Sequence, residues 1–295
     1  MSESRLENKL VGSFCTPRFT RRVLIRAHFL LSPNFMIEFM SQEEVEWCEL
    51  NKVRITTPGQ SDYPQFFSSC TYRPHFLTYW GQPIWNEKSM ISIVGSRNPS
   101  RQALDWMEQE LTLFLDRFDM PVVSGGARGV DQRAHQIALR MGRGTVVFVP
   151  AGLMKLYPDS LKEWVPAIIE NGGAVISQFA PKMSMQKGFF HARNRLIAAI
   201  SPVTLAVEAR RQSGTLLTSK HVLDIGHALG VVPSFPNEAG LGGLDLIVDG
   251  GAQIIRDADD LSVFAGAAKL VNSKAQKDDV GHPRADRRWH FSRPN

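Results

Sequence analysis

From about residue 90 to residue 265, short apolar runs alternate with longer stretches in which apolar residues recur every three to four positions. The longer stretches, around residues 103–118 and 130–141, predict amphipathic helices. The short runs predict buried strands at Ile91–Val94, Val122–Ser124, Thr145–Val149, Ala174–Ser177, Val203–Val207 and Val231–Val232. Strands that alternate with helices predict an α/β fold, in which a mostly parallel sheet has helices on both faces.

The remainder of the chain has a different pattern. Apolar residues at helical spacing between about 18 and 50 predict a small N-terminal helical cap. Residues 56–87 contain four prolines among aromatic residues, which indicates an ordered but irregular connector. We therefore expect three parts: a short helical region over 1–55, the α/β domain over 56–265, and a tail over 266–295.

The charge of the chain is mildly basic and is concentrated at its ends. The formal net charge is +5, which permits a nucleic-acid partner without requiring one. Residues 269–295 carry seven Lys or Arg against three Asp, so we expect a disordered tail. The tail either adds electrostatic affinity for a polyanion or serves solubility, and Trp289 and Phe291 could stack on a base or anchor a partner there.

Neither the cysteines nor the apolar segments indicate a membrane or secreted protein. The three cysteines are widely spaced and include no CxxC pair, so a disulfide framework and a zinc site lack support. There is no run of 18 apolar residues and no signal-peptide pattern. We expect a cytoplasmic protein without a membrane anchor, metal or cofactor.

A glycine-rich loop follows the second predicted strand. Gly125, Gly126 and Gly129 leave backbone N–H groups open beside the start of a helix, an arrangement that suits a phosphate. A tight strand-to-helix turn alone would use the same residues. Because no Lys-Ser or Lys-Thr pair follows, the loop is not that of a nucleoside triphosphatase.

Charged residues accompany this loop. Arg128 and Arg133 add positive charge. Asp131 and His135 are four residues apart on one helix face, and we interpret them as a structural pair that braces the loop rather than a catalytic dyad. The sequence shows no triad, paired carboxylates or metal-ligand spacing, so we predict a binding protein without catalytic residues.

Three further segments offer ligand contacts. Gly95-Ser96-Arg97 ends a strand, where the arginine is either solvated or a phosphate contact. The segment 189–195 combines aromatic residues with arginines, which suits single-stranded nucleic acid, although Phe190 also fits an ordinary buried helix start. Ser213-Gly214-Thr215 offers donors to a ligand or caps a helix. Since ligands of parallel sheets bind beyond the carboxyl ends of the strands, we expect these segments to converge there.

In this order along the chain, the segments resemble the DprA/Smf family of DNA-processing proteins. The resemblance runs from about Ile55 to Ala252 and is most specific over 124–135 and 213–218. It implies an extended Rossmann-like domain that binds single-stranded DNA without sequence preference. It also implies a homodimer that loads the RecA recombinase onto DNA during natural transformation.

The chain departs from the family pattern at several positions. Gln102-Ala103, Leu161, Ser234 and Leu244 replace the residues usual for the family, and the winged-helix domain of many members is absent from this sequence. These positions lie mostly outside the four loops, so they bear on partner docking more than on DNA binding.

Motifs and resemblance together predict one DNA-binding site. Its residues are Ser96, Arg97, Ser124, Gly125, Gly126, Arg128, Gly129, Phe190, Arg193, Asn194, Arg195, Ser213, Gly214 and Thr215. The alternative function is a nucleotide N-glycosidase of the lysine-decarboxylase-like type. Glu208 and the 213–215 segment only partly imitate the loop of those enzymes, because the glutamate precedes that loop instead of following it.

Overall fold

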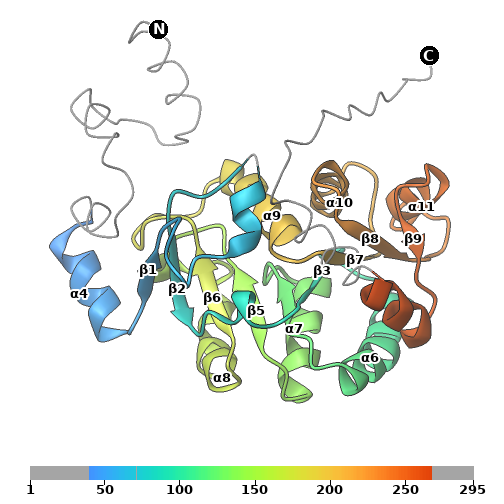
Figure 1. Ribbon diagram of the computed structural model, residues 1–295. Coiled ribbons are helices and arrows are strands. Elements are labelled where there is room, and N and C mark those ends of the chain that lie inside the picture. Colours follow the sequence, from blue (N-terminus) through green and yellow to red (C-terminus); the bar gives the residue numbers. More distant parts are fainter. Residues whose placement is uncertain (1–39, 71, 268–295) are drawn as a thin grey trace, which may run out of the picture.

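The computed structural model describes residues 40–70 and 72–267. Within these residues, nine strands form one sheet in the order β1-β2-β6-β5-β4-β3-β7-β8-β9 (Figure 1). The strands are β1 (Arg54–Thr56), β2 (Leu77–Gly81), β3 (Ile91–Gly95), β4 (Val122–Ser124), β5 (Thr145–Phe148), β6 (Ala174–Ser177), β7 (Val203–Val207), β8 (Ala228–Val232) and β9 (Gln253–Ile254). All six predicted strands are confirmed, although β8 begins three residues earlier than predicted.

The pairing is parallel from β6 through to β9, and only β1 and β2 add to the sheet in antiparallel fashion. The predicted mostly parallel α/β fold is therefore confirmed. The prediction of an irregular connector over 56–87 is wrong in part, because β2 pairs with β6 from Thr78 to Gly81. Pro74 and Pro83 lie outside β2 at its two ends, so they interrupt no hydrogen bonds of the strand.

Helices cover both faces of the sheet. One face carries the nearly continuous helix α5 (Arg101–Trp106), η4 (Met107–Leu111) and α6 (Thr112–Arg117), followed by α7 (Val130–Arg140), α8 (Val165–Glu170) and residues 258–267. The opposite face carries the short helix η2 (Gln65–Ser69), α9 (Lys187–Ile200), α10 (Gly214–Asp224) and α11 (Leu241–Val248). Figure 1 shows these two layers above and below the sheet.

The strands alternate between the two layers. Val122 and Val147 pack with the first layer, whereas Val123 and Val146 pack with the second. Because both sides of each central strand are buried, the strands read as continuous apolar runs. Burial on both faces holds the strand ends rigidly, which makes the loops at their carboxyl ends a fixed frame for a site.

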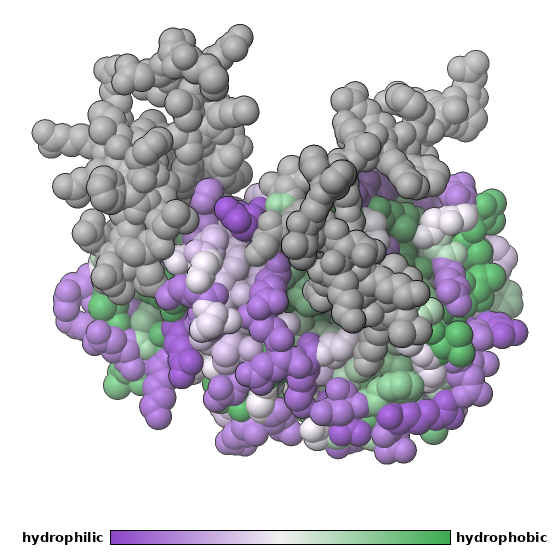
Figure 2. Space-filling view, in the orientation of Figure 1, coloured by the Kyte–Doolittle hydropathy of each residue, from purple (hydrophilic) through white to green (hydrophobic). Residues whose placement is uncertain are grey.

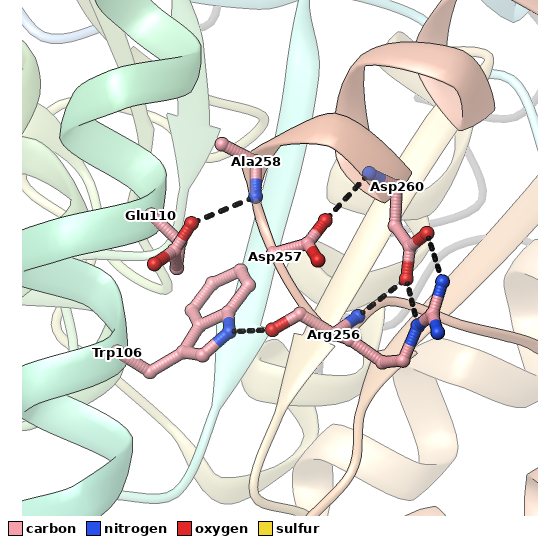
Figure 3. A network of polar contacts seen from close by, with 6 residues as sticks. All are labelled: Trp106, Glu110, Arg256, Asp257, Ala258 and Asp260. Atoms are coloured by element: carbon pink, nitrogen blue, oxygen red, sulfur yellow. Dashed lines mark hydrogen bonds and ion pairs between the residues drawn. The ribbon is translucent and has the colours of Figure 1, made fainter.

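The helix over residues 258–267 is tied to the first layer by a polar network (Figure 3). The indole N–H of Trp106 donates to the carbonyl oxygen of Arg256 at 2.7 Å. The carboxylate of Glu110 accepts from the backbone N–H of Ala258 at 2.9 Å, in the first turn of that helix. These bonds connect the end of the described chain to the long helix α5–α6.

At the other end, α4 (Gln42–Leu50) begins with a capping box between Ser41 and Glu44 and packs Cys48 against the sheet. This helix falls within the predicted N-terminal cap. The rest of that cap, and the predicted basic tail with Trp289 and Phe291, lie outside the described residues. Among the described helices, none is long and apolar enough to cross a membrane.

Candidate functional site

A pocket of about 310 Å³ lies at the carboxyl ends of β3, β4 and β5. Its walls come from the loops after these three strands and from the N-terminal half of α9. The lining residues are Arg97, Gly125, Ala127, Arg128, Tyr157, Pro158, Phe190 and Arg193. Three of the four predicted segments therefore meet at one place.

Two glycines of the loop after β4 allow its close packing. A Cβ atom on Gly125 would lie 1.6 Å from Nη1 of Arg193, so a side chain at this position would collide with the guanidinium group. A Cβ atom on Gly129 would lie 2.4 Å from the carbonyl oxygen of Ser96, and Gly129 has a φ of 93°. The glycines thus bring this loop against α9 on one side and against the loop after β3 on the other.

Arg193 is almost completely buried, with 5% of its surface exposed, yet it lines the pocket. Its Nη1 lies 3.9 Å from Oδ2 of Asp131, which is itself buried. The Nε of Arg193 has no hydrogen-bond partner. Because Arg193 also lines the pocket, its guanidinium group can pair with an anion there, and charge-assisted hydrogen bonds of this kind are strong.

The Asp131 carboxylate holds both Arg193 and the loop after β4. Burial raises the pKa of Asp131, and the nearby charge of Arg193 and the backbone N–H of Ala127 oppose this rise. Burial likewise lowers the pKa of Arg193, and Asp131 opposes it. The interpretation that Asp131 braces the loop is confirmed by its hydrogen bond from the N–H of Ala127.

His135 does not bind Asp131, although the two were interpreted as a pair. Its Nδ1 lies 2.7 Å from Oγ1 of Thr145, and complete burial lowers the pKa of the imidazole to about 3. His135 is therefore neutral and part of the core. The structural interpretation of both residues holds, but each has its own partner.

An aromatic ring lies between the cations of the pocket. The guanidinium carbons of Arg97 and Arg193 lie 5.2 and 6.0 Å from the ring centroid of Phe190. The ring of Tyr157 meets Phe190 edge-on, with the centroids 5.8 Å apart. Arg97 and Arg128 are both exposed, and Arg128 donates to the side chain of Asn98. The pocket thus offers three guanidinium groups around one partly exposed ring.

Glu208 lies outside the pocket and holds one of the loops that form it. It is 4% exposed, and its Oε2 accepts the backbone N–H of Ser100 at 2.7 Å, which fixes the loop that carries Arg97. Its backbone has a φ of 54°, an unusual conformation for a residue other than glycine. Because Glu208 is buried and does not line the pocket, it is poorly placed to act as the carboxylate of an N-glycosidase.

Several predicted site residues lie near the pocket but do not line it. Ser124 is fully buried and donates to the carbonyl oxygen of Ile93 at 2.6 Å. Ser96 accepts the N–H of Asn98 at 3.2 Å, and Gly126 is buried beside Val147. These residues shape the two loops instead of offering groups to a ligand.

The fourth segment, after β7, lies outside the pocket. Ser213 caps α10 by accepting the N–H of Leu216 at 3.1 Å, and Thr215 is buried. Asn194 reaches toward this segment and donates to the carbonyl oxygen of Gly214 at 3.4 Å. The capping interpretation is confirmed, and the predicted convergence of all four segments holds at this pocket for only three of them.

Arg195 also points away from the pocket. Phe190 and Arg193 are three residues apart and share a face of α9, whereas Arg195 is two residues further and lies on another face. Its guanidinium carbon lies 5.1 Å from the ring centroid of Tyr72. Sequence reasoning missed Tyr157 and Pro158 as pocket residues.

Comparison with known proteins decides the family. The model of the family "DNA recombination-mediator protein A" matches residues 54–266. The chain belongs to this family. The Smf protein of Synechocystis is 28% identical over 220 residues, which cover 73% of this chain and 55% of that protein, so the chain spans about half of its relative.

Two solved structures of DprA proteins share the fold of this family member. DprA of Streptococcus pneumoniae has a TM-score of 0.68 and 26% identity, over 83% of this chain and 82% of that one. DprA of Helicobacter pylori has a TM-score of 0.60 and 25% identity, over 76% of this chain and 97% of that one. The Helicobacter structure is described as revealing a single-stranded DNA binding mode.

Proposed function

We propose that this chain binds single-stranded DNA at the pocket, without sequence preference, and that it is a binding protein rather than an enzyme. The observation that carries the proposal is the meeting of three arginines at one pocket: the largely buried Arg193 and the exposed Arg97 and Arg128. Guanidinium groups bind phosphates, while the ring of Phe190 can stack on a base. Every base has an aromatic face, so such contacts do not select a sequence.

The shape of the pocket favours a single strand over a duplex. A volume of about 310 Å³ suits one unit of nucleotide size and excludes a double helix. A ring inside a pocket can stack only on a base that has left its pair. The single-stranded DNA binding described for the Helicobacter relative supports the same ligand for this chain.

We also propose that the protein loads RecA during natural transformation, that it is located in the cytoplasm and that it forms a homodimer. Membership of the family of DNA recombination-mediator proteins supports RecA loading and, with it, the location. For the homodimer, the sheet ends in β9, both of whose residues are exposed, and Val248 and Val263 near this edge are 84% and 68% exposed. Figure 2 shows hydrophobic residues gathered at this end of the molecule, where an unpaired strand edge offers a surface to a second copy.

The proposed DNA binding is tested by titrating a fluorescent oligothymidylate and a duplex of equal length with the protein. The single strand should bind more tightly, and Arg97→Ala should weaken its binding at least tenfold, as expected for the loss of one charge-assisted contact. Lys88→Ala is the matched control, because Lys88 is paired with Asp119 and precedes β3, at the amino end of the strand and so away from the pocket. Equal affinity for duplex, or an unchanged Arg97→Ala variant, would overturn the proposal.

The other parts have separate tests. The full chain should help RecA assemble on single strands coated with a single-strand binding protein, and it should sediment as a dimer that Val248→Asp converts to a monomer. Incubation with nucleoside monophosphates should release no base. Released base would favour the N-glycosidase, while a monomeric wild-type chain would refute the proposed interface.

A further inference from the structure

One face of α9 carries a row of basic residues outside the pocket. Lys187, His191 and Arg195 recur at intervals of four residues, so they form a stripe along the helix. All three are exposed. The same helix supplies Phe190 and Arg193 to the pocket, which places the stripe directly beside the pocket wall.

The residues of the stripe are not held in ion pairs within the described part of the chain. Over the part of the chain that the structure describes, Lys187, His191 and Arg195 form no ion pair with a carboxylate. Many other exposed cations do: Arg211, for example, holds Asp245 through two hydrogen bonds. The positive charge of the stripe is therefore available to an anionic partner.

Arg195 is held in position at the far end of the stripe. Its guanidinium group stacks over the ring of Tyr72, whose hydroxyl donates to Oε1 of Gln178 at 2.9 Å. A stacked guanidinium keeps its N–H edges free in the plane of the group, where they can bind a phosphate. The guanidinium group of Arg195 is therefore held in a position in which it can bind a phosphate.

A second helix extends the positive surface. Helices α9 and α10 lie side by side (Figure 1). Burial and the charge of Arg195 lower the pKa of His221 on α10, with His191 adding to the effect and Asp224 opposing it. The adjacent Lys220 is exposed. His191, Arg195 and His221 thus lie together where the two helices meet.

We propose that this stripe continues the DNA path: a strand that leaves the pocket crosses α9, and its phosphates bind Lys187 and Arg195, with His191 between them. The inference rests on the proposed function and extends it. Charge complementarity and continuity with the pocket favour the same DNA strand over a protein partner. From Lys187 to Arg195 the stripe is about 12 Å long, at 1.5 Å per residue, which is enough for a few nucleotides.

The test uses two lengths of oligothymidylate: a dinucleotide, which stays at the pocket, and a strand of about 20 nucleotides that also reaches the stripe. The variant is Lys187→Gln with Arg195→Gln, which keeps the helix and removes two charges. With the long strand, the slope of log K against log salt should become shallower by about 1.4, at about 0.7 per lost phosphate contact. With the short strand, affinity and slope should stay as in the unaltered chain.

A paired control carries Lys88→Gln with Arg117→Gln, two charges that precede β3 and β4 at the amino ends of these strands, away from the pocket. It should behave like the unaltered chain at both lengths. The inference is overturned if the stripe variant binds the long strand normally, or if it loses equal affinity at both lengths. Failure of Arg97→Ala to weaken either strand would instead refute the proposed function, so the two failures are distinguishable.

Discussion

Variants of the buried pair Arg193 and Asp131 can distinguish the effect of this pair on the stability of the protein from its effect on DNA binding. Replacement of Arg193 by Met keeps an unbranched apolar chain but leaves the carboxylate of Asp131 buried without its cation. The two side chains are 6% and 9% exposed, so water cannot replace the lost partner. Removal of one member of such a pair costs about 3 to 5 kcal/mol, which corresponds to a fall in Tm of about 6 to 20 °C for a protein of this size.

The double variant Arg193→Met with Asp131→Asn should recover most of this loss. The amide removes the buried charge, and its oxygen still accepts the N–H of Ala127. DNA affinity should not recover, because the guanidinium group that meets the phosphate is absent. Arg195→Met serves as the control, since an exposed arginine two residues away should change stability by less than about 0.5 kcal/mol.

The cost of Arg193→Met should also depend on pH. Burial raises the pKa of Asp131, and the loss of Arg193 removes the main force that opposes the rise. The folded variant therefore holds a proton that the unfolded chain releases above a pH of about 4. The deficit of the variant should be small below that pH and should grow as the pH rises through the folded pKa of Asp131.

Urea unfolding followed by circular dichroism measures these quantities at a series of pH values. The reasoning is refuted if Arg193→Met is as stable as the unaltered chain at neutral pH. It is also refuted if the added Asp131→Asn change lowers stability further.

Three further variants test other contacts of the site and of the fold. Gly125→Ala should fold but bind DNA about tenfold more weakly, because the new methyl group displaces the guanidinium of Arg193; normal affinity in a titration would contradict this. Glu208→Ala should lower the free energy of unfolding by about 1 to 3 kcal/mol and weaken DNA binding as well, since it strands a buried N–H of the loop after β3; urea unfolding that matches the unaltered chain would count against it. Glu110→Ala removes an acceptor from the first turn of the helix over 258–267, so it should cost about 1 kcal/mol and speed limited proteolysis there, while DNA affinity stays unchanged.

The central sheet could be predicted from the sequence because its strands are buried on both faces. Runs such as Val203–Val207 are mostly apolar, are buried throughout and are bounded by turn residues, so local pattern and tertiary position agree. β2 was missed because its ladder depends on β6, about a hundred residues away, and because nearby prolines resemble those of a loop. Pairing over such a distance leaves no local signal.

The sequence predicted five of the residues that line the pocket, but it did not predict how their side chains are arranged. Arg97, Gly125, Arg128, Phe190 and Arg193 do line one pocket. The sequence does not reveal that the guanidinium at 193 is buried against a carboxylate, or that the one at 195 faces elsewhere. Which face of a helix meets a loop depends on packing, which the spacing of residues along the chain does not determine.

The claim that the pocket holds a DNA strand is tested most directly by photo-crosslinking. A single strand that carries iodouracil, mixed with the full chain and irradiated, should link to the aromatic residues of the pocket, Phe190 and Tyr157, as identified by mass spectrometry. The duplex should give little of this product, and Arg97→Ala should reduce it. Crosslinks confined to residues outside the pocket, with none at Phe190 or Tyr157, would contradict the account.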